Sequence, residues 1–164
     1  FDKDFDEGGK TALEGKVNQN IAGNFLDKLK KTQKNKNLSY DTSDFDISEF
    51  NKLSSKDGLA TLSFITAKTI LDFARDLDLK KIIICGGGRY NRAILNYLEK
   101  DRFNISLIDD VRSSQSDDQI LGLNGDFIES QAFAYLAVRS YLKLPISFPE
   151  TTGCLKECTG GEKI

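Results

Sequence analysis

The stretch from Lys80 to Asn91 reads KKIIICGGGRYN, and it constrains the fold more than any other part of the chain. A run of isoleucines ends in Cys85, and three consecutive glycines follow it before a helical pattern begins. The run does not alternate between apolar and polar residues, so it predicts a strand covered on both faces, typical of a parallel sheet. Cys85 is therefore expected to be a small buried residue.

The segments around this strand predict an α/β protein. Apolar residues at helical spacing predict a helix within residues 15–33 and a second one after Ser54, which is a good N-cap. The expected apolar stripe of the second helix is Leu62, Ile65, Thr69, Phe73 and Leu77. A helix over about 91–100 and a strand over 104–108 make residues 81–108 a β-α-β unit. A further helix is expected from Asp126, and Pro145 should end it.

Composition excludes several kinds of chemistry. The chain has 164 residues, a net charge of −2 and no histidine, so nucleic acid is not an expected partner and imidazole-based catalysis and metal sites are excluded. Any general base must be a carboxylate, lysine, tyrosine or thiolate. No apolar stretch approaches the about 18 residues of a membrane span. The cysteines Cys85, Cys154 and Cys158, without a secretory signal, fit a reducing cytoplasm and predict no metal site.

Two phosphate-binding patterns can be compared with the glycine triplet. A P-loop requires G-x-x-x-x-G-K-[ST], and 9–11 supply its tail, but Asp4 stands where the first glycine should be, so this motif is excluded. A dinucleotide fold requires G-x-G-x-x-G with an acidic residue after the next strand. Gly86, Gly88 and Asp109 fit that pattern, whereas Asn91 replaces the third glycine.

A third use of such glycines is the nucleotide turn of actin-like and sugar-kinase ATPases. Glycines after a strand let a nucleotide lie against bare backbone, and a helix that follows offers free N–H groups to an anion. A tight turn without any ligand is the plain alternative.

Three ordered phrases resemble the C-terminal portion of the bacterial anhydro-N-acetylmuramic acid kinases. They are CGGGRYN at 85–91, GLNGDFIESQAFAYLAVR at 122–139 and LPISFPETTG at 144–153. The opening FDKDFDEGGKTALEGKVN and the middle LSYDTSDFDIS are also similar to this family, so the resemblance covers almost the whole chain. Arg89 and Ser130 depart from it, because alanine usually stands at both positions.

The resemblance implies an α/β fold that is the C-terminal half of an actin-like (ribonuclease H-like) ATPase, with a short parallel or mixed sheet flanked by helices. Residues 1–164 would then be a single-domain fragment, the nucleotide- and sugar-binding half of a two-domain kinase. The chain has no methionine and begins in mid-pattern, so its natural start is expected upstream.

The family's reaction is also implied. ATP with Mg²⁺ would phosphorylate O6 of 1,6-anhydro-N-acetylmuramic acid while water opens the anhydro ring, giving N-acetylmuramic acid 6-phosphate in cell-wall recycling. The general-base aspartate would lie upstream, so no catalytic residue is expected here and the fragment alone should be inactive. The resemblance suggests a cytoplasmic enzyme and a homodimer, with no nucleic acid or membrane partner.

Site residues follow from the matched motifs. Gly86, Gly87 and Gly88 would face the nucleotide, and Asn91 would orient it or the adjacent wall. Glu129 would contact sugar hydroxyls, although by its position alone it is an ordinary solvated carboxylate in a first helical turn.

Asp126 is expected to cap the helix that follows it, rather than to contact a ligand.

Two other functions are alternatives to a sugar kinase. They are a dinucleotide-binding (Rossmann-like) dehydrogenase domain and a non-catalytic interaction domain.

Overall fold

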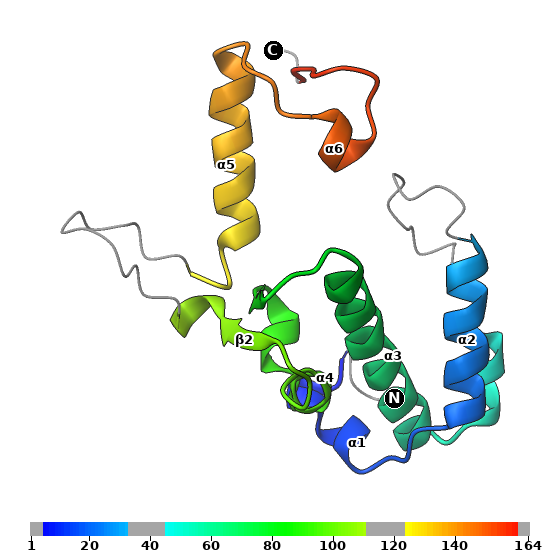
Figure 1. The fold of residues 1–164 in the computed structure, drawn as a ribbon. Coiled ribbons are helices and arrows are strands. Elements are labelled where there is room, and N and C mark those ends of the chain that lie inside the picture. Colours follow the sequence, from blue (N-terminus) through cyan, green and yellow to red (C-terminus); the bar gives the residue numbers. More distant parts are fainter. Residues whose placement is uncertain (1–4, 33–44, 111–123, 161–164) are drawn as a thin grey trace.

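The computed structural model describes residues 5–32, 45–110 and 124–160, and the account below concerns these residues (Figure 1). Its helices, strands and short 3₁₀ turns (η) are, in chain order, η1 (Glu7–Gly9), α1 (Lys10–Leu13), α2 (Gln19–Thr32), η3 (Ser48–Lys52), α3 (Ser55–Asp76), β1 (Lys81–Ile84), η4 (Gly87–Tyr90), α4 (Arg92–Leu98), β2 (Asn104–Leu107), η5 (Ile108–Asp110), α5 (Ile128–Tyr141) and α6 (Pro149–Thr152). None of these helices is both long and apolar enough to cross a membrane.

The predicted β-α-β unit is confirmed. β1 and β2 pair in parallel, with Lys81 opposite Asn104 and Ile84 opposite Leu107, and α4 forms the crossover between them. The described part of the chain is therefore α/β, with helices and a two-stranded parallel sheet. This unit places the end of β1, and the glycines that follow it, beside the end of β2.

The core lies between the sheet and two helices. Its buried side chains come from α3, from α4 and from the segment leading into β2: Ala67, Leu71, Ala74, Leu95, Leu98 and Phe103. One face of the sheet packs against this cluster through Ile82, Ile84, Ile105 and Leu107.

The expectation that the first strand is covered on both faces is wrong for the described residues. Ile83 is 44% exposed, and Cys85 is also exposed instead of buried. Both helices of the core pack on the same face of the sheet, so alternate side chains of β1 face away from them. An unbroken apolar run does not reveal this difference, because coverage depends on neighbouring elements.

Helix α3 begins as predicted, but its buried face differs from the expected stripe. The hydroxyl of Ser54 accepts the Asp57 N–H at 3.1 Å and so caps the helix. Ile65 is buried, whereas Phe73 and Leu77 are 59% and 54% exposed. Alanines occupy much of the buried face, where their small side chains allow α1 and α4 to approach closely.

The first turn of α3 also holds the loop that enters α2. The Asp57 carboxylate accepts the Lys16 N–H at 2.7 Å, and the Thr61 hydroxyl accepts the Asn18 N–H at 3.0 Å. A Cβ atom added to Gly15 would lie 2.0 Å from the carbonyl oxygen of Lys56. Only glycine therefore permits this contact between the loop and the α3 backbone.

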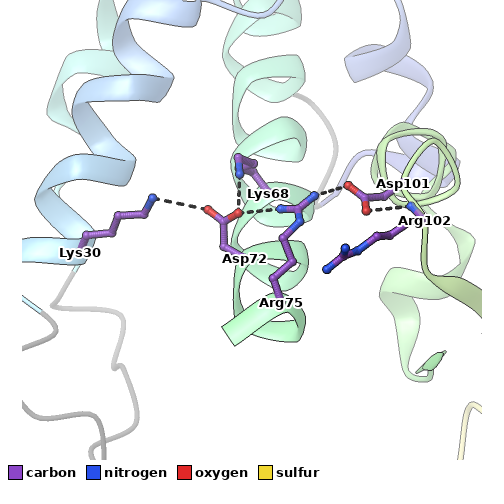
Figure 2. A network of polar contacts seen from close by, with 6 residues as sticks. All are labelled: Lys30, Lys68, Asp72, Arg75, Asp101 and Arg102. Atoms are coloured by element: carbon purple, nitrogen blue, oxygen red, sulfur yellow. Dashed lines mark hydrogen bonds and ion pairs between the residues drawn. The ribbon is translucent and has the colours of Figure 1, made fainter. Parts of the chain in front are cut away.

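A network of charged side chains joins α2, α3 and the segment before β2 (Figure 2). The Asp72 carboxylate accepts hydrogen bonds from Lys68 and, at 2.8 Å, from Arg75. It also forms an ion pair with Lys30 of α2 at 3.6 Å. Arg75 also contacts Asp101, which lies between α4 and β2. Partial burial opposes ionisation of Asp72, but the surrounding cations outweigh it and lower the pKa of this carboxyl below its ordinary value.

We expect Asp72→Asn to reduce the free energy of unfolding by about 1–2 kcal/mol at neutral pH, since it removes a carboxylate shared by three cations. Because the pKa of Asp72 is lowered in the folded protein, its contribution is complete above the ordinary value of 3.8 and is lost as the pH falls below it. Urea unfolding of both proteins should therefore show a difference that shrinks in acid. A constant difference across that range would contradict the assignment to the charge of Asp72.

Candidate functional site

The glycine triplet forms a sharp turn directly after β1. Gly86 has φ 71° and ψ −176°, a backbone conformation that essentially only glycine adopts. The next two glycines begin the 3₁₀ turn η4, and α4 starts only at Arg92. The glycines therefore form a separate turn ahead of α4, and this helix begins close to residue 91, where the sequence predicted its start.

Nothing in the described part of the chain requires glycine at positions 87 and 88. Neither has a positive φ, and a Cβ atom added to either would meet no heavy atom of the described residues within 4 Å. Backbone strain and close packing are the usual reasons for a glycine, and both are missing here. What two bare residues do provide is an open strip of backbone that a ligand can approach closely.

Asn91 stabilises the start of α4. Its side-chain oxygen accepts the N–H groups of Ala93 at 3.0 Å and Ile94 at 3.2 Å, which makes it the N-cap of α4. A Cβ atom added to Gly9 would lie 2.2 Å from that same oxygen, so the N-terminal segment packs directly on the cap. A contact between Asn91 and a nucleotide remains a prediction, and Gly9 is a neighbour that the motif did not reveal.

Arg89 is the main residue at this site to which the sequence assigned no role. Its side chain is only 1% exposed, although it lies in a polar turn. The guanidinium donates to Asp109 at 2.7 Å and to the carbonyl oxygen of Gly86 at 3.0 Å, and it pairs with Asp126 at 2.9 Å. The guanidinium also donates to the Tyr90 hydroxyl, and its Cζ atom lies 4.0 Å from the centroid of the Tyr90 ring. The available signal in the sequence was that Arg89 departs from the alanine that the resemblance implies at this position.

The charges of this cluster support one another. Burial disfavours the charged form of Arg89, but the hydrogen bonds that it donates to Asp109 and Asp126 outweigh this effect and raise the pKa of the guanidinium. The Gly125 N–H donates to Asp109 at 2.9 Å, and this bond, followed by the bond from Arg89, lowers the pKa of that carboxyl. The contacts of the cluster therefore favour the charged forms of Arg89 and Asp109.

The segment before α5 is joined to the glycine turn. The Gly86 N–H donates to the Gly125 carbonyl oxygen at 3.2 Å, and Asp126 pairs with Arg89. The expectation that Asp126 caps the helix is wrong, because the N-cap is Phe127 and no side chain of the described residues caps the start of α5. Asp126 instead reaches a buried cation from a distant part of the sequence.

Glu129 lies in the first turn of α5, close in sequence to this joined segment. Its side chain is exposed, and no residue of α5 is buried within the described chain. Figure 1 shows α5 extending away from α2 and α3. The structure thus brings the start of α5 to the glycine turn, while the contact of Glu129 with a sugar remains a prediction.

A parallel β-α-β unit whose first strand ends in an open glycine turn defines an α/β protein with a backbone surface suited to a ligand. The chain belongs to the anhydro-N-acetylmuramic acid kinase family, whose model matches residues 1–163.

Curated relatives named anhydro-N-acetylmuramic acid kinase agree with this assignment. The protein of Pelagibacter ubique is 40% identical over 96% of this chain, that of Brucella canis 37% over 98%, and that of Caulobacter vibrioides 38% over 98%. The chain spans 42% of the length of the first two relatives and 41% of the third.

Proposed function

We propose that this chain is the C-terminal, nucleotide- and sugar-binding half of an ATP-dependent kinase of 1,6-anhydro-N-acetylmuramic acid. Family membership and the names of the relatives support the substrate. The observation that carries the nucleotide site is the pair of glycines at 87 and 88, which neither backbone strain nor packing against the described residues requires. An actin-like fold and a single domain over 1–164 belong to the same proposal.

In the proposed reaction, water adds to C1 of the sugar and the C1–O6 bond breaks. O6 takes the γ-phosphoryl group of ATP, ADP leaves, and the product is N-acetylmuramic acid 6-phosphate. The proton of the water passes to a carboxylate base, which we place in the rest of the complete protein, so the 164 residues alone should be inactive. Mg²⁺ would accompany the ATP phosphates and offset their charge, and we assign no residue of this chain to it.

Each predicted site residue has a role in this proposal. Gly86, Gly87 and Gly88 would form the backbone surface on which the nucleotide lies. Asn91 would keep the following helix in place through its N-cap bonds and so define the edge of that surface. Glu129 would accept hydrogen bonds from sugar hydroxyls, for which a solvated carboxylate at a helix start is available.

The dinucleotide alternative is disfavoured by the family assignment, because the kinase model matches residues 1–163. Asp109 stands where a dinucleotide fold places its ribose-binding acid. Here its two oxygens accept from Arg89 at 2.7 Å and from the Gly125 N–H at 2.9 Å. A non-catalytic interaction domain is the outcome that would follow if the complete protein bound no nucleotide.

We expect Glu129→Ala in the complete protein to lower kcat/KM for the anhydro sugar by roughly 10–100-fold, the loss of a charge-assisted hydrogen bond. The affinity for ATP should stay within about twofold, because Glu129 touches only the sugar in this proposal. Steady-state kinetics with varied sugar and ATP make the measurement.

Glu157→Ala is the matched control, since it removes another exposed carboxylate near the chain end. Unchanged kinetics in both variants would remove Glu129 from the site. An inactive unmodified protein that binds neither ATP nor the sugar would overturn the proposed function itself.

A further inference from the structure

Arg89 contacts three segments that are far apart in the sequence. Its guanidinium donates to Gly86 in the glycine turn, to Asp109 in η5 after β2, and pairs with Asp126 just before α5. The arginine side chain is 1% exposed, whereas the two aspartate side chains are 43% and 55% exposed. A single buried cation therefore joins the proposed nucleotide surface to the helix that carries Glu129.

The shape of the contact is as specific as its charge. A Cβ atom added to Gly125 would lie 2.5 Å from Nε of Arg89 and 2.6 Å from its Cζ. The chain before α5 thus lies directly against the guanidinium, with no room for a side chain between them. A planar guanidinium can donate in three directions at once, which the single ammonium of lysine cannot do in the same geometry.

These contacts link the position of the glycine turn to that of the α5 entrance. A buried arginine that loses one of its two carboxylate partners keeps its full desolvation cost with less compensation, so displacing one segment alone is unfavourable. A ligand that settles on the glycine turn therefore also selects the position of Gly125 and Asp126.

We propose that Arg89 is a positioning residue that couples nucleotide binding at the glycine turn to sugar binding at the start of α5. The inference rests on the proposed function, which supplies the two ligands. Its own content is the thermodynamic link between them, which is reciprocal: each ligand changes the affinity of the other by the same factor.

The test is isothermal titration of the complete protein with 1,6-anhydro-N-acetylmuramic acid, with and without a saturating non-hydrolysable ATP analogue. In the unmodified protein, the nucleotide should tighten sugar binding by about fivefold or more. In Arg89→Ala this ratio should fall to near one, and Arg89→Lys should restore little of it. Arg92→Ala is the matched control, because Arg92 follows the same turn but is exposed and pairs with Glu99.

Asp126→Asn covers the case in which Arg89→Ala does not fold. This carboxylate is more than half exposed, and its loss weakens only the link to α5 while the contacts of Arg89 with Gly86 and Asp109 remain. A reduced ratio in Asp126→Asn supports the inference. An unchanged ratio in that folded variant, or no coupling in the unmodified protein, overturns it even if both ligands bind. Absence of binding by either ligand would overturn the proposed function and this inference together.

Discussion

Gly87→Val should weaken binding of ATP to the complete protein by about tenfold or more. A Cβ atom added at this position meets no heavy atom of the described residues within 4 Å, so the variant is expected to fold normally. The same side chain would occupy the space above the backbone where we place the nucleotide, and a loss of contact at close range costs at least about 1.4 kcal/mol. Titration with a non-hydrolysable ATP analogue measures the effect.

Gly23→Val provides a control for this experiment. Gly23 lies on α2, and an added Cβ atom there also meets nothing within 4 Å, so the chemical change and the local freedom are the same. Its nucleotide affinity should equal that of the unmodified protein. Equal affinity in Gly87→Val would mean that the triplet is only a turn, and the proposed nucleotide surface would have to be abandoned.

Gly15→Ala should cause the largest loss of stability, about 2–4 kcal/mol in the free energy of unfolding. The added Cβ atom would lie 2.0 Å from the carbonyl oxygen and 2.3 Å from the carbonyl carbon of Lys56. Both are backbone atoms in the first turn of α3, so no side-chain rotation relieves the clash. The loop must move away, and the bonds from Lys16 to Asp57 and from Asn18 to Thr61 are weakened with it.

Gly58→Ala is the matched control, because it makes the same substitution near Lys56 in a helical position with nothing within 4 Å. It should stabilise the protein by up to about 1 kcal/mol through helix propensity and a less flexible unfolded chain. Thermal and urea unfolding of the two variants should therefore move in opposite directions. A Gly15→Ala variant as stable as the unmodified protein would contradict the close packing of this loop.

Much of the local structure could be predicted from the sequence. The β-α-β unit and the Ser54 cap follow from periodicity and from capping chemistry, which act over a few residues. The position of the glycine turn after a strand followed from the same patterns. Exposure was predicted less well: Cys85 and Phe73 lie in apolar patterns but are exposed, because burial depends on which elements cover a face.

For the candidate site, the sequence identified residues, whereas the structure showed their contacts and exposure. Gly86–Gly88, Asn91 and Glu129 were identified by matching motifs, and the structure then gave Asn91 a capping role and left Glu129 exposed. Asp126 was expected to cap α5, but it pairs with Arg89. A carboxylate before a helix favours capping by default, and a buried cation brought from another segment offers a stronger partner.

The sequence by itself determined the order of strand, glycine turn and helix, and its motifs identified the kinase family. These features depend on backbone preferences and on spacing along the chain, both of which are local. Only the tertiary structure decided that Arg89 is buried among Gly86, Asp109 and Asp126. Burial and charge pairing of this kind arise when distant segments meet. The parallel pairing of β1 with β2 brings Gly86 and Asp109 together, and the bond from the Gly86 N–H to the Gly125 carbonyl oxygen adds the segment of Asp126.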